Sequence, residues 1–381
     1  MARHWSINGR FLTQPQTGVQ RYACEILRAL DELLEIDHPL ASMLEIELLV
    51  PKGQTIELPL HHIRTRIVAG ARGHLWEQLV LPQNVSGGLI SLCNTGPIAL
   101  LKHIVCIHDL NTRLYPASYS LPFRTLYRAL LPTLGRSAKA VVTVSRFSAG
   151  QLINYGIGST ENINVIPNGH EHALRWRPRH TRKTRSAAGP KTVVLIGSLA
   201  AHKNIGLVLG LASKLAASGL KIAVAGINDV RVFNASEASP AADNIIWLGR
   251  LSDDELAALL MDSFCLAFPS FTEGFGLPPL EAMALGCPVI ATDRASLPEI
   301  CGEAALFASP ADAESWLQQF IRLRNNKPLR AQLVTKGRLR AKHFSWSRSA
   351  ELYLELMAGA DGVSPSYRRE LALSRQLQAH T

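Results

Sequence analysis

Long uncharged apolar runs are missing from this sequence of 381 residues, although 47% of its residues are hydrophobic. No stretch reaches the roughly 18 residues that a membrane-spanning helix needs. The opening residues, MARHWSINGRF, do not contain the apolar core of a secretory signal. A chain this rich in apolar residues is also too hydrophobic to remain disordered. We therefore expect a folded protein that stays in the cytosol.

Paired cysteines are absent as well. None of the six cysteines belongs to a C-x-x-C pair, and most lie in apolar stretches, which favours buried free thiols over disulfides. His103 and His108 lie near Cys106, but the spacing matches no zinc finger or ribbon. The six are Cys24, Cys93, Cys106, Cys265, Cys287 and Cys301.

Two cofactor signatures are also missing. No strand-like segment is followed by G-x-G-x-x-G, which argues against a dehydrogenase. No Asp-x-Asp motif or other carboxylate and histidine cluster has the spacing of metal ligands. We therefore expect neither a metal nor a cofactor.

Apolar strand-like segments alternate with helical periodicity throughout the chain. This alternation predicts parallel sheets that are covered by helices on both faces. In the second half the predicted strands are 191–199, 220–226, 244–249, 264–270 and 287–292, with helices over 205–218, 252–262 and 278–286. In the first half they are 46–50, 88–93, 103–110, 140–145 and 162–167, with helices over 18–35, 121–135 and 146–155.

The chain is too long for one ordinary core, since single cores stop growing near about 250 to 300 residues. Periodicity fails in a polar segment that holds six basic residues between positions 175 and 185. We therefore predict an α/β protein with two Rossmann-like doubly wound domains that face each other across a cleft. Their predicted bounds are 1–170 and 191–345, with a basic linker over 171–190 and a C-terminal helix and polar tail over 346–381.

Positive charge is concentrated in the first half. The net charge is +10, and residues 1–190 hold 21 Lys and Arg against 12 Asp and Glu. Such an asymmetry favours an anionic partner, namely a phosphorylated ligand, a nucleic acid or a membrane surface, although a solvated Arg-rich surface has the same composition. A nucleic acid is disfavoured because the basic run at 175–185 holds Trp176 as its one aromatic residue.

The most specific motif is a pair of carboxylates eight positions apart, Glu273 and Glu281, around the turn GFGLP. Gly274 and Gly276 let backbone N–H groups approach a phosphate or a sugar hydroxyl, and the helix that follows adds the positive end of its dipole. Glu281 falls about one turn into this helix, where a carboxylate can accept hydrogen bonds from a ribose diol.

These residues resemble the retaining glycosyltransferases of family 4, which have the GT-B fold of two Rossmann-like domains. The E-x7-E motif of that family matches Glu273 to Glu281, and its continuation matches residues 281–292. The resemblance extends over nearly the whole chain. Its other segments are Gly197, His202-Lys203-Asn204, Pro167-Asn168-Gly169, Val144-Ser145, His108-Asp109 and the opening NGRFLTQPQTGVQRYACEIL.

The resemblance implies that a hexose moves from a nucleotide diphosphate sugar to a hydroxyl, with retention of configuration and without an obligatory metal. Lys203 and the backbone of residues 274–277, including Phe275 and Leu277, then stabilise the departing diphosphate. Many members have an arginine where this chain has Ser198. Arg250 is one candidate for the missing charge.

The same resemblance implies roles for the other candidate residues. Glu273 orients the hydroxyls of the donor sugar, Glu281 holds the ribose, and neither is a covalent nucleophile. His108 contacts the donor sugar from the first domain, and Asn168 belongs to the donor site. The acceptor loops are expected at Gly18, Asn94, Gly96 and Asp109, where the glycines have ordinary turns as their alternative.

The resemblance also implies substrates and a place of action. It favours GDP-mannose as the donor, with rhamnosyl or other deoxyhexosyl transfer and glucosyl transfer as alternatives, and a nucleotide-sugar epimerase as an alternative of another class. The expected acceptor is a lipid-linked glycan or oligosaccharide of bacterial surface polysaccharide synthesis. The expected partners include no nucleic acid, and the protein is expected to bind peripherally to the anionic cytoplasmic face of the inner membrane.

Overall fold

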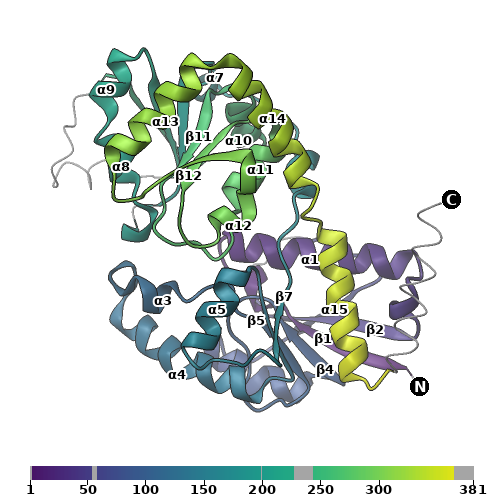
Figure 1. Ribbon diagram of the computed structural model, residues 1–381. Helices are drawn as coiled ribbons and strands as arrows, with labels where there is room; N and C mark the ends of the chain where they lie inside the picture. The colour runs from purple at the N-terminus through teal and green to yellow at the C-terminus, as the bar shows by residue number, and fades with distance from the viewer. Residues whose placement is uncertain (1, 54–57, 199, 227–242, 364–381) are drawn as a thin grey trace. The chain divides into compact units, whose positions relative to one another are not determined.

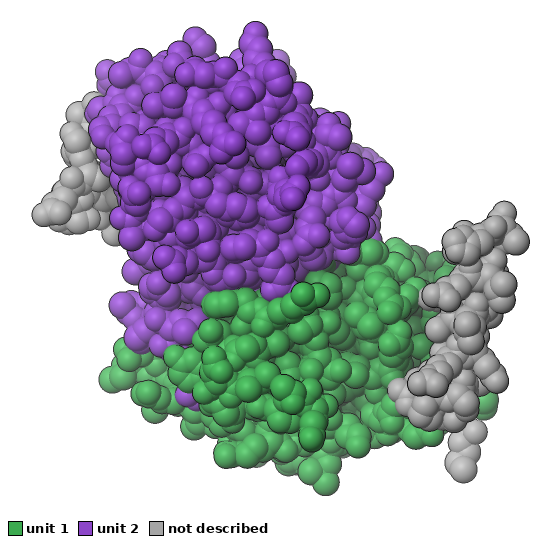
Figure 2. Space-filling model, in the orientation of Figure 1, with its two compact units in different colours: residues 1–110, 121–168, 345–381 green, residues 111–120, 169–344 purple. Residues whose placement is uncertain are grey.

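The computed structural model describes residues 2–53, 58–198, 200–226 and 243–363, and the chain divides into two compact units (Figure 2). Unit 1 consists of residues 1–110, 121–168 and 345–381. Unit 2 consists of residues 111–120 and 169–344. Most of the predicted polar tail, from residue 364 onward, lies outside the described residues.

Unit 1 is built on a seven-stranded parallel sheet with the strand order β3-β2-β1-β4-β5-β6-β7 (Figure 1). Buried apolar side chains dominate its central strands, as expected for a parallel sheet with both faces covered. The strands are β1 (Arg3–Asn8), β2 (Leu44–Pro51), β3 (Arg64–Val68), β4 (Gly88–Ser91), β5 (His103–Cys106), β6 (Ala140–Thr143) and β7 (Ile163–Val165).

The helices of unit 1 include one from the C-terminal part of the chain. Helix α15 packs on α1, and the hydroxyls of Tyr22 and Tyr353 lie 3.1 Å apart between them (Figure 1). The helices are α1 (Gly18–Glu35), α2 (Gly73–Leu75), α4 (Leu121–Ser137), α5 (Arg146–Asn154) and α15 (Trp346–Ala360), with short helical turns η1 (Gly9–Thr13), η2 (Pro39–Ala41), η3 (Trp76–Val80) and η4 (Leu81–Asn84).

Unit 2 is built on a six-stranded parallel sheet with the order β10-β9-β8-β11-β12-β13. Val194 of β8 lies opposite Ala223 of β9 and Leu266 of β11, so β8 has a central place. The strands are β8 (Thr192–Ile196), β9 (Lys221–Ala225), β10 (Ile245–Gly249), β11 (Cys265–Phe268), β12 (Val289–Thr292) and β13 (Ala305–Ala308).

Helices cover this second sheet as the alternating pattern predicted. The capping box at Ser252 and Glu255 is confirmed, because the Ser252 backbone N–H donates to Glu255 Oε2 at 2.9 Å. The helices are α3 (Asn111–Leu114), α6 (Glu171–Arg175), α7 (Arg182–Ala187), α8 (Ile205–Leu209), α9 (Ala212–Ala217), α10 (Asp253–Asp262), α11 (Leu277–Leu285), α12 (Leu297–Cys301), α13 (Ala313–Asn325) and α14 (Lys327–Ala341), with turns η5 (Pro116–Ser118), η6 (Ala201–Lys203) and η8 (Gly302–Ala304).

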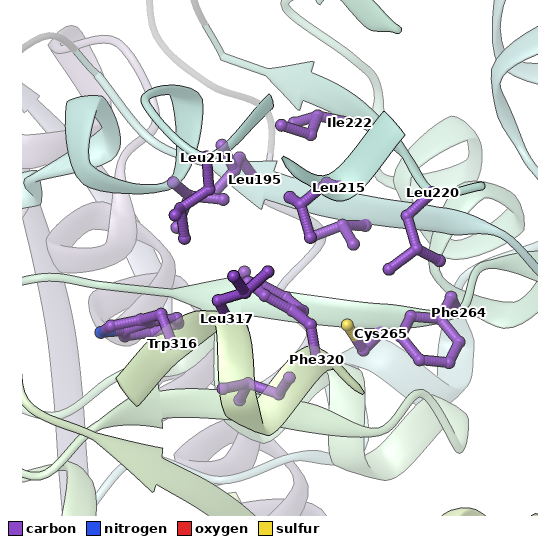
Figure 3. Close-up of a cluster of buried hydrophobic side chains, with 14 of the residues drawn as sticks. Leu195, Leu211, Leu215, Leu220, Ile222, Phe264, Cys265, Trp316, Leu317 and Phe320 are labelled. Carbon is purple, nitrogen blue, oxygen red and sulfur yellow. The ribbon is translucent and has the colours of Figure 1, made fainter. Parts of the chain in front are cut away.

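A large apolar cluster fills the core of unit 2. Figure 3 shows Phe320 of α13 lying close to Cys265 of β11, while Trp316 of the same helix lies at the other end of the cluster. Leu211 and Leu215 approach Leu195 and Ile222, which belong to the neighbouring strands β8 and β9. This core supports the strands whose carboxyl ends carry the predicted donor site.

Three strands and one break escaped the sequence analysis. Strand β3 is an edge strand whose side chains are mostly exposed, so RTRIV has no apolar signature. The sequence analysis also missed β1 and the short strand β13. The helix predicted over 205–218 is divided into α8 and α9, which are separated by Gly210 and Leu211.

The segments predicted as an interdomain linker and as a separate C-terminal helix are parts of the two units. Within residues 171–190, helices α6 and α7 belong to unit 2, and α15 belongs to unit 1. Residues 111–120, from the first half of the sequence, also belong to unit 2. The six basic residues at 175–185 therefore lie in unit 2, and unit 1 holds 18 Lys and Arg against 15 Asp and Glu. The positive charge of residues 1–190 is therefore divided between the two units, and the basic segment 175–185 does not belong to unit 1.

Two expectations about the chain as a whole can be compared with the structure. All six cysteines are free, and all except the half-buried Cys93 are buried, which confirms the prediction of free thiols. Among the described residues, no helix combines the length and the apolar character needed to cross a membrane.

Candidate active site

Lys203 and Glu273, two residues predicted to contact the donor, follow adjacent central strands of unit 2. Ser198 and Lys203 come after β8, and Glu273 comes after β11. Because all six strands run parallel, these residues meet at one edge of the sheet. This edge is where doubly wound folds bind their ligands.

Lys203 and Glu273 form an ion pair at this edge. Lys203 Nζ lies 2.8 Å and 3.1 Å from the two carboxylate oxygens of Glu273. The two side chains are 24% and 12% exposed, so the pair is partly open to solvent. Asn204 adopts a left-handed conformation at φ 51° and donates from Nδ2 to the carbonyls of Pro269 and Pro310. These bonds connect the turn after β8 to the segments after β11 and β13.

Ser296 forms hydrogen bonds with the turn between Glu273 and α11. Its Oγ lies 2.7 Å from the carbonyl oxygen of Phe275 and 3.0 Å from that of Glu273, and it donates its single proton to them. Gly276 has φ 107°, and a Cβ there would lie 2.6 Å from Leu297 Cδ2. The backbone conformation therefore favours glycine, and a Cβ would also displace the end of the Leu297 side chain.

The turn at residues 274–277, which is predicted to bind an anion, has fewer backbone N–H donors after it than a standard helix start. Pro278 and Pro279 occupy the first turn of α11, and neither has a backbone N–H. The N–H groups of residues 274–277 are thus those through which this turn can bind an oxygen anion. Phe275 and Leu277 are buried, so their contribution to a ligand is confined to the backbone.

Glu281 is buried on α11 and has a partner that the sequence analysis did not single out. Its Oε1 lies 2.9 Å from Nε2 of His172, which belongs to α6. The two side chains are 7% and 2% exposed. Trp176 packs its ring against His172 at 5.4 Å in an edge-to-face arrangement.

His202, the residue before Lys203, contacts the segment 111–120. Its Nδ1 lies 3.0 Å from Ser118 Oγ, and its ring stacks on Tyr119 at 6.2 Å. Burial lowers the pKa of His202, and the charge of Lys203 lowers it further. The histidine beside Lys203 therefore stays neutral near pH 7, which avoids a second positive charge next to the ion pair.

In unit 1, His108 is buried after β5 and has a defined tautomer. Its Nε2 donates to the carbonyl of Leu92 at 2.8 Å, and its ring meets Tyr22 edge to face at 4.8 Å. Burial lowers the pKa of His108 to about 4. At neutral pH the ring is uncharged, so Nδ1 keeps a lone pair and acts as a hydrogen-bond acceptor.

The other residues predicted in unit 1 occupy loops around this histidine or helix ends. Asn94 adopts φ 65° and accepts the backbone N–H of His108 at 2.7 Å. Gly96 is buried where a Cβ would lie 2.5 Å from the His103 ring. Asp109 is half-buried, and Gly18 is exposed at the start of α1. The acceptor roles of these residues stay predictions.

The residues expected to complete the phosphate clamp are more scattered. Ser198 is exposed and accepts the Ala200 N–H at 3.4 Å. Arg250 is exposed after the edge strand β10, which β9 separates from β8. Asn168 is the last residue of the second segment of unit 1, and its buried Oδ1 has no hydrogen-bond partner among the described residues. Their roles in donor binding also stay predictions.

Unit 1 contains a buried polar network that the sequence analysis missed. Glu77 is 1% exposed and accepts hydrogen bonds from Asn8 Nδ2 at 2.7 Å, Arg10 Nε at 3.2 Å and Thr95 Oγ1 at 3.1 Å. Burial alone raises the pKa of Glu77, but the hydrogen bond from His74 and the charge of Arg10 outweigh it, so the pKa is lowered. The network ties β1 to the loop after β4.

The missed residues share the lack of a local sequence signal. His172 and Glu281 lie 109 positions apart, and Arg10 and Glu77 lie 67 apart. Ser296 follows a strand, as many turn serines do.

The described residues contain no group of three or more His, Cys, Asp or Glu that could hold a metal ion. Independence of metal stays a prediction.

Known protein families account for most of the chain. Residues 90–174 match the family model described as Glycosyltransferase Family 4, and residues 177–340 match the model described as Glycosyl transferases group 1. The fold is therefore that of a glycosyltransferase. The chain belongs to the family 4 glycosyltransferases with the GT-B fold, which confirms the resemblance predicted from its motifs.

Two curated relatives are similar to the chain over most of its length. O-antigen chain mannosyltransferase B of Escherichia coli is 28% identical over 266 residues, which is 66% of this chain and 68% of the relative. O-antigen chain mannosyltransferase RfbU of Salmonella typhimurium is 26% identical over 320 residues, which is 81% of this chain and 88% of the relative.

Solved structures share the fold. Sucrose-phosphate synthase from Thermosynechococcus elongatus superimposes with a TM-score of 0.70 at 18% identity, covering 95% of this chain and 100% of that one. At this identity the likeness establishes the fold alone.

Proposed function

We propose that this protein is a retaining glycosyltransferase that moves mannose from GDP-mannose to a hydroxyl of a lipid-linked glycan in bacterial surface polysaccharide synthesis. The observation that carries the proposal is the Lys203–Glu273 ion pair at the carboxyl ends of β8 and β11, in the unit that matches the group 1 glycosyltransferases. It supports a site for a ligand that joins a phosphate group to a sugar.

The chemistry of such a donor explains why these two residues are adjacent. In a nucleotide diphosphate sugar, the bond that breaks joins the anomeric carbon to an oxygen of the diphosphate. A lysine that binds this phosphate stabilises the charge of the leaving group. Because the Glu273 carboxylate lies 2.8 Å from the same ammonium group, it is close enough to accept hydrogen bonds from the hydroxyls of the attached sugar.

Glu281 supplies the remaining part of the proposed donor site. It lies on the second turn of α11, past the turn at 274–277, and its carboxylate can accept two hydrogen bonds from the ribose diol. The backbone N–H groups of the turn then contact the diphosphate. This order along the chain follows the order sugar, diphosphate and ribose along the donor.

In unit 1, the neutral His108 is suited to accept a hydrogen bond from a donor-sugar hydroxyl through Nδ1. It is not suited to act as a cation or a general acid at neutral pH, because burial lowers its pKa to about 4. In the proposed reaction, the acceptor oxygen attacks the anomeric carbon from the face that the diphosphate leaves. The acceptor proton then passes to a phosphate oxygen.

Mannose is favoured because the two curated relatives are named mannosyltransferases of the O-antigen chain. Deoxyhexosyl and glucosyl transfer remain the alternatives. A thermal-shift panel of GDP, UDP, dTDP and ADP tests the base, and a ligand at 100 times its Kd adds roughly 2.7 kcal/mol of stability. We expect GDP to give the largest shift. Stabilisation by UDP or dTDP alone contradicts the GDP-mannose assignment.

Product analysis tests the reaction itself. We expect transfer from GDP-α-mannose to a lipid-linked oligosaccharide to form an α-linked product, detected by the one-bond carbon–proton coupling at the new anomeric position. A β-linked product contradicts retention. Interconversion of the free nucleotide sugar without transfer favours the epimerase alternative.

The lipid-linked acceptor implies a surface that meets the membrane, and α4 is the segment of unit 1 that suits it best. Leu121 and Leu126 are exposed on this helix, which also carries Arg124, Arg128 and Arg136. Exposed leucines beside basic residues suit an anionic lipid surface. We propose that this helix binds the protein to the cytoplasmic face of the inner membrane, where a lipid-linked acceptor is presented.

A further inference from the structure

Glu281, the proposed ribose ligand, has a buried hydrogen-bond partner in His172. Its Nε2 lies 2.9 Å from Glu281 Oε1, and both side chains are almost completely buried. A carboxylate oxygen only accepts hydrogen bonds, so Nε2 carries the proton and donates it. The imidazole therefore fixes one oxygen of the carboxylate in a defined position.

The elements around this pair limit its freedom. Glu281 lies on α11, which is buried along most of its length, and α6 packs against it. The His172 ring is bounded by Trp176, which lies just after α6. Neither side chain can change rotamer without disturbing buried neighbours, so the carboxylate plane is set by the tertiary structure.

We propose that His172 is a positioning residue for donor recognition, which orients the Glu281 carboxylate so that it accepts the 2′ and 3′ hydroxyls of the donor ribose. This inference rests on the proposed function, because it assigns the ribose to Glu281. His172 does not contact the reacting atoms, and its effect is exerted through Glu281. Hydrogen bonds to a charged group depend strongly on geometry, so loss of the N–H donor weakens recognition of the diol in particular.

A purely structural role makes a different prediction. If His172 only joined α6 to α11, its replacement would lower stability and weaken all nucleotides alike. A positioning role changes the preference for a ribose over a sugar without hydroxyls. The ratio of two affinities therefore separates the two roles.

The experiment measures binding of GDP and of 2′,3′-dideoxy-GDP by calorimetry, or of the uridine pair if UDP is the better ligand of the wild-type protein. The variants are His172→Leu, which removes the N–H donor at similar volume, and His172→Gln, whose amide can still donate to Glu281. His180→Ala is the matched control, because His180 Nε2 also lies 2.9 Å from a carboxylate, that of the exposed Asp262. Thermal melts establish that each variant is folded.

We expect the wild-type protein and His180→Ala to prefer the ribonucleotide by about tenfold or more, from the worth of hydrogen bonds to a charged acceptor. In His172→Leu this preference falls below about threefold while dideoxynucleotide binding stays within about twofold, and His172→Gln restores most of it. An unchanged preference in His172→Leu, or an equal loss for both nucleotides, overturns the inference. If His172→Leu does not fold, Glu281→Gln provides the test. An unchanged preference for the ribonucleotide in Glu281→Gln also overturns the inference, because Glu281 then does not bind the diol.

The proposed function fails in a different way. If GDP, UDP, dTDP and ADP all leave the wild-type protein unaffected, there is no nucleotide site, and both proposals are overturned. If a nucleoside diphosphate binds but the wild-type protein shows no preference for its ribose form, the inference alone is overturned.

Discussion

The two units have similar parallel sheets but differ in the exposure of the polar residues described at their strand ends. Unit 2 leaves an ion pair partly open at its strand ends, with Lys203 24% and Glu273 12% exposed. Unit 1 has buried polar groups with internal partners near its strand ends, as in the network of Glu77 and in the His108 bond to Leu92. Charges that remain accessible can exchange partners with a ligand. Buried groups with internal partners instead provide shape and fixed hydrogen-bond acceptors.

The largest expected effect concerns the charged residues of the proposed donor site in unit 2. We expect Lys203→Ala and Glu281→Gln each to reduce transfer by roughly 10² or more, as when one preorganised charge partner is lost. Glu281→Gln should act largely through the KM of the donor. Lys214→Ala is the matched control, because Lys214 pairs with Glu314 at 3.3 Å on the exposed surface. Near-normal rates of both variants at saturating donor contradict the site assignment.

The buried histidines of unit 1 predict a pH dependence of stability. Burial lowers the pKa values of His103 and His108 to about 4, from about 6.5 in the unfolded chain. Between these values the unfolded state binds more protons, so the free energy of unfolding falls as the pH decreases from 6.5 to 4. Each histidine contributes a loss of about 3 kcal/mol when the pH reaches its folded pKa.

Denaturant titrations at pH 7, 6 and 5 measure this slope. His103→Gln can keep the hydrogen bond that His103 makes with Ser91 at 3.0 Å, and it should reduce the slope by about 1 kcal/mol per pH unit between pH 7 and 5. His4→Gln, on an exposed histidine of β1, serves as the control. A slope that is unaffected by His103→Gln shows that this histidine does not carry the pH dependence.

A backbone test concerns the turn that holds Glu273. Gly276→Ala places a Cβ 2.6 Å from Leu297 Cδ2 at φ 107°, and we expect it to lower the free energy of unfolding by about 1 to 3 kcal/mol and to weaken donor binding. Gly206→Ala, in α8, meets no atom within 4 Å and is the control. Equal melting temperatures of the two variants contradict the required geometry of this turn.

Membrane binding tests whether α4 binds an anionic lipid surface. We expect the protein to co-sediment with anionic but not with zwitterionic vesicles. It should be released in roughly 0.5 M salt, because salt screens the attraction between its basic residues and the lipid headgroups. Arg124→Glu with Arg136→Glu should weaken binding by at least about 2 kcal/mol, at about 1 kcal/mol for each basic residue lost. Arg322→Glu with Arg324→Glu on α13 changes the net charge equally and is the control. Equal partition onto both vesicle types contradicts the proposal.

The smallest expected effect is that of chelation. We expect transfer in excess EDTA to equal that in its absence, because Lys203 and the N–H groups of 274–277 are proposed to stabilise the diphosphate. The measurement is the initial rate over a range of EDTA concentrations. A steep loss of rate that magnesium reverses contradicts this expectation.

Local patterns predicted much of the fold and part of the site. Helix α1 was predicted with its observed bounds, and the strands of unit 2 from β8 to β12 were predicted within a few residues. The carboxylates Glu273 and Glu281 were identified because their spacing around a glycine turn is local. Strand β3 was missed because an exposed edge strand lacks a continuous apolar run.

By itself, the sequence determined the alternating elements, the E-x7-E turn and the family, because each is expressed in the spacing of neighbouring residues. The tertiary structure alone decided that α15 packs in unit 1, that the basic segment 175–185 belongs to unit 2 and that His172 holds Glu281. It also decided that His108 is neutral, since burial sets its pKa. These properties depend on contacts between residues far apart in the chain, and side-chain periodicity does not encode which distant segments pack together.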